Sequence, residues 1–277
     1  MTLSLDTLSC PLPHLGVIQA QGDDAAAFLH NQLTQDVLLL NEHGARLAAW
    51  CNPKGRMLAS FVLCKPQPDQ VLLICQRDVL PQTLKRLSMF VMRSKVKLSD
   101  ASDAFHVHGL MGDALRALTE EASPWRRIAP DVQTQLLTLY PALGQPRALW
   151  LAPIDVTPPA ATPSDDDAQA LWAYAEVMSG VAWVGAATAE AFVPQMLNYE
   201  SVDGVNFKKG CYPGQEVVAR SQFRGTLKRR AFIVASPQAL HAGQEVFSSA
   251  DPTQPCGLIA QAASVREQHV AIAELQI

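Results

Sequence analysis

The chain has 277 residues, of which 48% are hydrophobic and 17% are charged, and its formal net charge is -4 at pH 7. This length allows a substantial core and more than one domain. The slightly acidic balance argues against broad nucleic-acid binding, and every apolar run is too short to span a bilayer. The first residues, MTLSLDTLSC, lack the basic region and apolar block of a secretion signal. We therefore expect a cytoplasmic protein without membrane association.

The cysteines are scattered singly along the chain, and none belongs to a CxxC pair. This pattern is typical of a reducing compartment and predicts neither a disulfide framework nor a structural zinc site. No resident metal is therefore expected. The six cysteines are Cys10, Cys51, Cys64, Cys75, Cys211 and Cys256.

The first hundred residues show an α+β pattern with antiparallel hairpins. Apolar alternation and helical spacing predict strands over 15–20, 45–51, 57–64, 71–75 and 95–98 and helices over 25–34 and 78–92. Asn52-Pro53-Lys54-Gly55 has the residue order of a type I turn, so it predicts a hairpin between two of these strands.

The pattern restarts near residue 104. Strands are expected over 105–110, 136–140 and 147–151, with a short helix over 113–118, and a helix over 165–179 begins with three aspartates and ends before Gly180. The Pro/Ala-rich stretch 152–164 is the clearest linker, and short strands follow from residue 231. We thus divide the chain into 1–100, a middle α+β domain 101–160, a segment 161–230 that returns to the first domain, and a small β domain 231–277.

The stretch KKGCYPGQEVVARSQFRG, residues 208–225, gathers a thiol, a carboxylate and several cations. Pro213 suits the first position of a helix, and Glu216 would fall in its first turn. Cys211 would then lie just outside a helix N-terminus and close to two lysines, a setting that lowers the pKa of a thiol. A reactive or ligand-binding thiol is one interpretation, and a turn cysteine packed for its size is the other.

Other candidates are weaker. The spacing of Arg220 and Arg224 places both on one helix face, where they could bind an anion or simply be solvated. His106 and His108 alternate on a strand and could be two metal ligands, but we expect a solvent-facing pair. Trp172 is expected in the core because tryptophan is usually highly buried.

The octapeptide KGCYPGQE, 209–216, matches the signature K-G-C-[FY]-x-G-Q-E, and the chain resembles the YgfZ-type folate-binding proteins, relatives of the glycine-cleavage aminomethyltransferase (T-protein). Further matches make the resemblance span nearly the whole chain: FLHNQLTQDV (28–37), WCNPKGRML (50–58), FVPQMLNYE (192–200) and GVNFKKGC (204–211). It implies α+β domains of antiparallel sheets and helices in a ring around a folate site, closed by a small C-terminal β-barrel. It also implies that tetrahydrofolate or a derivative is bound, and that the chain acts in synthesis or repair of iron–sulfur clusters of certain enzymes. Its effect on tRNA modification would be indirect.

The resemblance also assigns residues. Trp172 matches a helix position whose aromatic side chain lines the folate pocket in the family, so it would stack on the pterin. We expect Tyr212, Gln215 and Arg220 to assist in binding folate. Cys211 is expected to be the functional thiol, with the residues Lys209 and Glu216 as its electrostatic setting.

One departure bears on mechanism. T-proteins carry a pair of aspartates after the hairpin turn, where this chain has Ala59 and Ser60. We therefore expect no aminomethyltransferase activity. Leu15 stands where relatives have a second pocket aromatic. Two alternatives remain. One is a folate-dependent one-carbon transferase of the aminomethyltransferase type. The other is a folate-independent adaptor that docks iron–sulfur enzymes or assembly proteins through the basic run, residues 208–230. Tight binding of nucleic acid is not expected.

Overall fold

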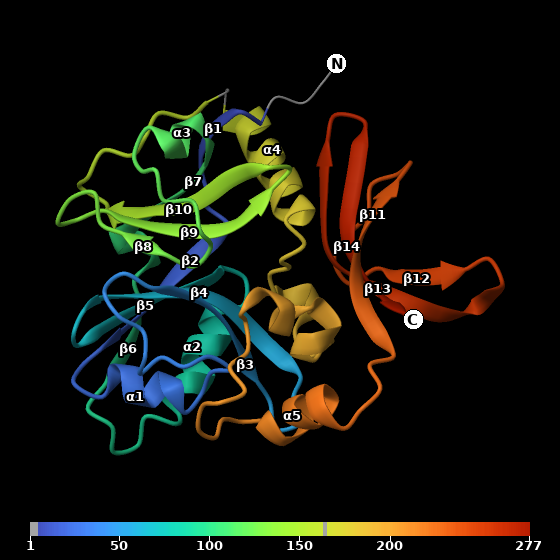
Figure 1. The fold of residues 1–277 in the computed structure, drawn as a ribbon, viewed down its shortest axis with the longest axis horizontal. Helices are drawn as coiled ribbons and strands as arrows, with labels where there is room; N and C mark the ends of the chain where they lie inside the picture. The colour runs from blue at the N-terminus through green and yellow to red at the C-terminus, as the bar shows by residue number, and fades with distance from the viewer. Residues whose placement is uncertain (1–4, 163–164) are drawn as a thin grey trace.

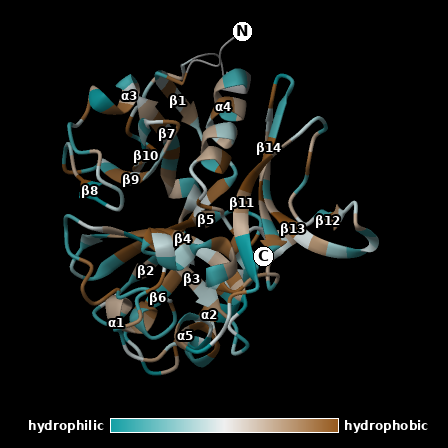
Figure 2. Ribbon diagram, turned by 45° about the vertical axis from the view of Figure 1, so that its right-hand side comes forward, coloured by the Kyte–Doolittle hydropathy of each residue, from teal (hydrophilic) through white to brown (hydrophobic). Residues whose placement is uncertain are grey.

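The computed structural model describes residues 5–162 and 165–277, which form three antiparallel sheets with helices packed at their sides (Figure 1). The mixed α+β class expected from the sequence is confirmed. Polar residues lie mostly in loops and on the outer sides of helices, whereas hydrophobic residues follow the strands between the sheets (Figure 2). The sheets therefore meet at a shared apolar interior.

The first sheet has the strand order β3-β4-β5-β2-β6. Helices α1 and α2 lie on the same side of it, below the sheet in Figure 1. Buried leucines of both helices pack against the strands, which gives this side a core of its own. The bounds are β2 Leu15–Gln21, α1 Ala25–His30, β3 Ala45–Cys51, β4 Met57–Gln67, β5 Gln70–Gln76, α2 Leu80–Ser88 and β6 Lys97–Asp100.

The second sheet has the order β1-β7-β10-β9-β8. Strand β1 pairs with β7, so the N-terminal segment contributes a strand to a sheet otherwise built from the middle of the chain. The boundaries between the four expected segments stay a prediction. The bounds are β1 Thr7–Pro11, η1 Ser102–Ala104, β7 Phe105–Gly112, α3 Asp113–Arg116, β8 Arg127–Ile128, β9 Gln135–Ala142 and β10 Gln145–Pro153.

The rest of the chain returns past the first sheet and ends in a third. Helix α4 spans Asp165–Met178, and three short 3-10 turns follow: η2 Ala186–Thr188, η3 Pro194–Leu197 and η4 Tyr199–Val202. Helix α5 spans Gln215–Phe223. The third sheet, in the order β11-β14-β13-β12, is compatible with a small barrel-like domain. Its bounds are β11 Arg229–Ser236, β12 Glu245–Ser248, β13 Asp251–Val265 and β14 Gln268–Gln276.

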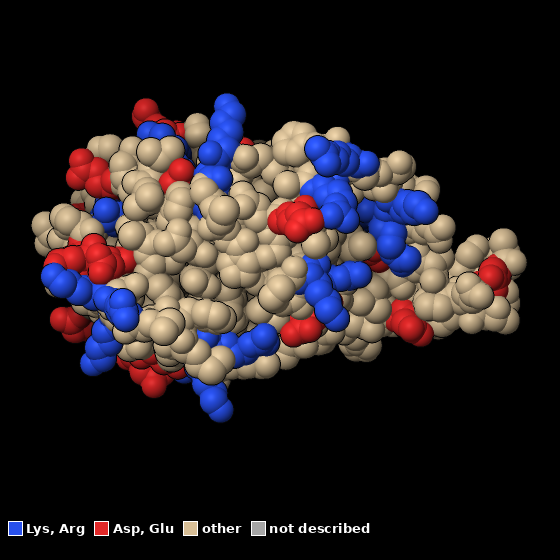
Figure 3. Space-filling view, turned by 90° about the horizontal axis from the view of Figure 1, so that it is seen from below, with Lys and Arg blue, Asp and Glu red and all other residues tan. Residues whose placement is uncertain are grey.

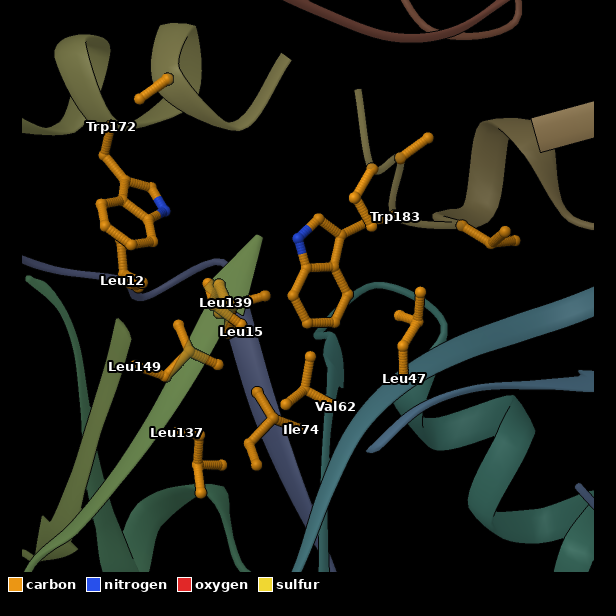
Figure 4. Close-up of a cluster of buried hydrophobic side chains, with 14 of the residues drawn as sticks. Leu12, Leu15, Leu47, Val62, Ile74, Leu137, Leu139, Leu149, Trp172 and Trp183 are labelled. Atoms are coloured by element: carbon orange, nitrogen blue, oxygen red, sulfur yellow. The ribbon is translucent and has the colours of Figure 1, made fainter. Parts of the chain in front are cut away.

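Strand β4 separates two cores because successive side chains of a strand point to opposite faces. Phe61 and Leu63 join the core beneath α1 and α2. Val62 faces the other way, into a central core where Leu137 and Leu149 of the second sheet meet it (Figure 4). Helix α4 covers this central core with Trp172.

The predicted hairpin turn is confirmed. The backbone N–H of Gly55 donates to the carbonyl oxygen of Asn52 at 2.9 Å, and Gly55 has φ +72°, a left-handed conformation that favours glycine. The helix expected over 78–92 ends earlier, at Ser88. Met89 and Met92 beyond it are exposed, so no buried face continues the helix there.

Candidate functional site

The loop that carries the KGC sequence is held against the hairpin of the first sheet. Gly214 adopts φ +81°, and a Cβ added there would lie 2.4 Å from the carbonyl oxygen of Asn52. Only glycine therefore allows this approach. The side-chain oxygen of Asn206 accepts the backbone N–H groups of Lys208 (2.8 Å) and Lys209 (3.1 Å), which fixes the start of the loop.

Lys209 points inward from this loop to the end of α1. Its ammonium group donates to the carbonyl oxygens of His30 (2.6 Å), Leu33 (3.1 Å) and Gly210 (3.2 Å). It also lies 4.5 Å from the centre of the Tyr212 ring, within the range of a cation–π interaction. Burial lowers the pKa of Lys209 to about 8, and the nearby charges of Asp36 and Cys211 oppose this shift. The lysine therefore ties the loop to α1.

Cys211 lies exposed on this loop. By contrast, burial raises the pKa of the thiols of Cys51, Cys64 and Cys75 to about 12. Helix α5 has Gly214 as its N-cap, so Pro213 lies before the helix and the expectation that it opens the helix was wrong. The accessible thiol sits three residues before the N-cap, on a loop whose neighbours are fixed.

His30 lies beside this loop, although no sequence pattern predicts it there. His30 is nine-tenths buried, and its Nε2 lies 3.6 Å from the position that a Cβ on Gly210 would occupy. Its Nδ1 lies 3.1 Å from a carboxylate oxygen of Asp36. Both residues belong to the stretch FLHNQLTQDV, yet nothing in the sequence pairs that stretch with residues 209–216. The contact became visible only in the fold.

The polar side chains after the cysteine face different ways. The amide nitrogen of Gln215 lies 3.5 Å from the carbonyl oxygens of Lys209 and Gly210. Glu216 is in the first turn of α5 as expected, and its carboxylate accepts from Arg220 at 2.6 Å on the exposed side of the helix. Gln215 is therefore turned toward the thiol loop, whereas Glu216 and Arg220 form an ion pair that is exposed to solvent.

Part of the basic run is committed to ion pairs. Arg229 donates to Glu274 at 2.5 Å, and Arg230 donates to Glu200. Both glutamates are largely buried. The first pair links β11 to β14 within the third sheet, and the second joins the third sheet to the η4 turn. Lysine and arginine side chains gather on the underside of the protein (Figure 3), the side on which α5 lies in Figure 1.

A second candidate site lies where the first sheet, α4 and the third sheet meet. This junction pocket has a volume of about 530 Å³. Glu176 lies at its floor, only 3% exposed, and accepts hydrogen bonds from the indole nitrogen of Trp183 (3.0 Å) and the amide of Gln261 (3.4 Å). The wall includes His14, Asp78 and His241.

Trp172 lies deeper than the lining of this pocket. It is fully buried, and a Cβ on Gly109 would approach its ring to 2.5 Å. The guanidinium carbon of Arg147 lies 5.1 Å from the ring centre. Leu15 is also buried in the central core (Figure 4). The structure thus brings Lys209, Tyr212 and Gln215 to the loop of Cys211 and places Trp172 in a different region.

The two positions that carry aspartates in T-proteins face opposite sides of β4. Ala59 belongs to the core beneath α1 and α2. The hydroxyl oxygen of Ser60 accepts the backbone N–H of Val184 at 2.9 Å. Only Ser60 is therefore turned toward the segment that carries Trp183, and it already has a structural partner.

The expectation that His106 and His108 both face solvent was wrong. His108 is 6% exposed and packs edge-on against Trp150, with ring centres 5.7 Å apart. Its place on β7 turns it inward because Trp150 is its partner on the neighbouring strand. Within residues 5–162 and 165–277, no cluster of three or more His, Cys, Asp or Glu is arranged to hold a metal ion. None of the helices described is long and apolar enough to cross a membrane.

Three antiparallel sheets around one central core define the fold of the aminomethyltransferase T class. The glycine cleavage system aminomethyltransferase T of Bartonella henselae superimposes with a TM-score of 0.71, over 98% of this chain and 78% of that one, at 15% sequence identity. No family model matches the sequence.

Proteins related in sequence identify the family more specifically than the fold does. A tRNA-modifying protein YgfZ of Photobacterium profundum is 32% identical over 230 residues, 79% of this chain and 67% of the relative. Its counterpart in Colwellia psychrerythraea is 30% identical, with 83% and 72% covered. An uncharacterized protein of Haemophilus influenzae is 31% identical, with 83% and 75% covered. The chain belongs to the YgfZ family of tRNA-modifying proteins.

Proposed function

We propose that this protein binds tetrahydrofolate or a close derivative and uses Cys211 to support the synthesis or repair of iron–sulfur clusters in certain enzymes. An effect on tRNA modification then follows from the enzymes it supports. Family membership and the aminomethyltransferase fold support the folate part. The accessible thiol on a fixed loop is the observation that carries the rest.

The junction pocket suits a folate in size and composition. Its volume of about 530 Å³ lies in the range of small-molecule sites. Trp183 offers an aromatic surface, and Glu176 offers a buried carboxylate for the amino groups of a pterin. When bound, tetrahydrofolate would supply a carrier of one-carbon units. With Ala59 and Ser60 at the aspartate positions, the chain lacks the carboxylates that would use it for aminomethyl transfer.

Cys211 differs from the other cysteines in exposure. It is exposed, Cys256 is partly exposed and the other four are buried. A thiolate attacks electrophiles and binds soft metals. Iron–sulfur clusters usually need about four cysteine ligands, so one exposed thiol suits transient transfer or a redox contact better than a resident cluster.

The test of this role is complementation. In cells that lack the native protein, Cys211→Ser should keep the fold and any folate affinity but abolish support of iron–sulfur enzyme activity. Cys256→Ser is the matched control and should complement fully. Full complementation by Cys211→Ser would make the cysteine structural, and the rate of thiol alkylation against pH provides an independent check.

Calorimetry with tetrahydrofolate tests the proposed folate binding. Binding without methylene transfer in an assay with an aminomethyl donor is the expected result, and clear transferase activity would overturn it. The adaptor function would be favoured by two results together. Tetrahydrofolate would not bind the protein, and a client enzyme would bind equally well to the wild type and to Trp172→Ala.

A further inference from the structure

The imidazole of His30 has one nitrogen that is paired and one that is not. Its Nδ1 lies 3.1 Å from a carboxylate oxygen of Asp36. Because an ionised carboxylate only accepts, Nδ1 carries a proton and donates, and Nε2 of the neutral ring keeps a lone pair. Among the described residues Nε2 has no hydrogen-bond partner, although the side chain is only 10% exposed. A basic nitrogen is therefore left unoccupied in a ring that is nine-tenths buried.

This nitrogen faces the loop of Cys211 at a glycine. Nε2 lies 3.6 Å from the position that a Cβ on Gly210 would occupy, and it is the only heavy atom within 4 Å of that position besides those of the neighbouring residues in the chain. Gly210 is not among the glycines with positive φ, so its backbone conformation does not require glycine. A larger residue would place its side chain against the edge of the imidazole. Glycine leaves that edge uncovered immediately before the cysteine.

The fold fixes the imidazole, its carboxylate and the loop relative to one another. The ammonium group of Lys209 ties the loop to the carbonyl oxygen of His30 at 2.6 Å, and the carboxylate of Asp36 also accepts the backbone N–H of Leu39 at 3.0 Å. In Figure 1 the orange chain that leads into α5 passes beside the end of α1. Within the described residues no hydrogen bond holds the exposed thiol of Cys211, so its side chain is free to change rotamer.

Few charged or titratable groups surround the imidazole. Asp36 lies on the segment after α1, and Lys209 and Cys211 lie on the loop. Strand β5 packs against α1 and contributes apolar side chains and the thiol of Cys75, whose pKa burial raises to about 12. The charges of Lys209 and Cys211 also interact. The ammonium group, however, donates to three carbonyl oxygens and has no lone pair, so it can stabilise a thiolate but cannot take the thiol proton.

We propose that His30, oriented by Asp36, is the base that activates the thiol of Cys211. When the thiol turns toward Gly210, the bond between Sγ and its hydrogen breaks, the proton passes to Nε2, and the electron pair stays on sulfur. The product is a thiolate beside an imidazolium whose Nδ1 donates to Asp36. A nucleophile, a base and a third group that orients the base are the usual parts of an activated cysteine. This inference rests on the proposed function of Cys211 and adds the group that sets its reactivity near neutral pH.

The test follows alkylation of Cys211 by iodoacetamide on the full chain, from about pH 5.5 to about pH 10.5. Every protein carries Cys256→Ser, because Cys256 is partly exposed and would also react. The midpoint of the rate profile should lie at least about one pH unit below the free value of ~8.5 in the otherwise wild-type chain. His30→Gln should raise the midpoint by about one unit, which is a tenfold change in the ionisation equilibrium.

The limiting rate at high pH separates a base from a structural residue. There the thiol is ionised with or without His30, so the limiting rate should stay the same or rise up to about threefold, since a more basic thiolate is the better nucleophile. A purely structural role would change this limiting rate and leave the midpoint where it is. Lys209 is kept in all variants, so the loss of its own charge near its pKa of about 8 affects every profile.

Two further variants complete the set. Asp36→Asn keeps an oxygen acceptor for the imidazole but removes the charge, so it should raise the midpoint by part of the amount seen in His30→Gln. His43→Gln is the matched control. His43 is exposed and its carbonyl oxygen accepts the backbone N–H of Arg127 at the start of β8, so the midpoint should not move. Thermal unfolding confirms that each variant is folded.

The possible failures are distinguishable. A midpoint near 8.5 in the otherwise wild-type chain, a low midpoint that His30→Gln leaves unchanged, or a change confined to the limiting rate would overturn the role of His30. Each of these results leaves the proposed function of Cys211 standing. Full complementation by Cys211→Ser, which is a separate assay in cells, would overturn the proposed function whatever the midpoint. If His30→Gln does not fold, Asp36→Asn decides.

Discussion

The ammonium group of Lys209 lies 2.6 Å from the carbonyl oxygen of His30, 179 residues earlier in the chain. The same group reaches Leu33, so it bonds carbonyl oxygens at and just beyond the end of α1. A cation near a helix C-terminus also interacts favourably with the helix dipole. The lysine of the KGC sequence thus joins the exposed thiol loop to the first sheet's helix.

Replacing this lysine should therefore destabilise the fold and loosen the loop. Lys209→Met leaves buried carbonyl oxygens without a donor, and we expect a loss of about 2–4 kcal/mol in the free energy of unfolding. Urea denaturation measures the loss. Cys211 should also be alkylated at a changed rate, because its neighbour no longer holds the loop.

Lys208→Met is the matched control for Lys209→Met. Lys208 is exposed, so its replacement should change stability by no more than about 0.5 kcal/mol. Equal stability of the two variants would show that the inward lysine contributes nothing to the fold.

The buried thiols predict how stability depends on alkaline pH. The pKa values of Cys51, Cys64 and Cys75 are raised from 9.0 to about 12 by burial. Above pH 9 the unfolded chain releases these protons while the folded chain keeps them. The unfolded state then binds fewer protons, so the free energy of unfolding falls as pH rises from 9 toward 12. At pH 10.5 each thiol should cost about 2 kcal/mol.

Cys64→Ala measures the contribution of one buried thiol to this loss of stability at high pH. The variant should lose less stability than the wild type between pH 8 and pH 10.5, by about 2 kcal/mol, although it is less stable at pH 8. Val62→Ala, which trims a buried side chain that does not titrate, is the control and should keep the wild-type pH dependence. Parallel pH curves for wild type and Cys64→Ala would contradict the assignment of a buried, protonated thiol.

Restoring a carboxylate at the aspartate positions should fail for a structural reason. Ala59 is fully buried in the core beneath α1 and α2. Ala59→Asp buries a carboxyl group among apolar side chains, and we expect it to destabilise the protein by more than about 3 kcal/mol. Urea denaturation of Ala59→Asp beside Ala59→Val, which changes size without adding charge, separates the two causes. A stable Ala59→Asp protein would mean that this side chain can reach water.

Local patterns predicted most of the first sheet. Alternating apolar residues located β2 to β5, and the order Asn52-Pro53-Lys54-Gly55 located the hairpin turn, because strand pairing and turn geometry depend on neighbouring residues. The α+β class and the burial of Trp172 followed from the same kind of reasoning.

Features set by distant contacts could not be predicted. Lys209 was expected only as part of the electrostatic setting of Cys211, because its partners at the end of α1 are far away in the chain. His108 was expected in solvent because nothing local showed that Trp150 pairs with it. Arg147 and Glu176 carry no motif at all. Glu176 became a candidate only when the fold placed it in the lining of the junction pocket.

Binding of tRNA should be weak and governed by salt. Of the basic run, Arg220, Arg229 and Arg230 are already paired with carboxylates. Few cations remain for phosphate contacts, and the net charge is -4. Gel shifts at 150 mM salt should therefore give dissociation constants no tighter than about 1 μM, with affinity falling steeply as salt rises.

Arg224→Gln with Lys228→Gln should flatten that salt dependence of tRNA binding, because its slope is proportional to the number of phosphates that the protein neutralises. The exposed Lys97→Gln, from the edge strand β6, is the control. Sub-micromolar binding that resists salt would instead mean that tRNA itself is a ligand, recognised by contacts other than this basic run.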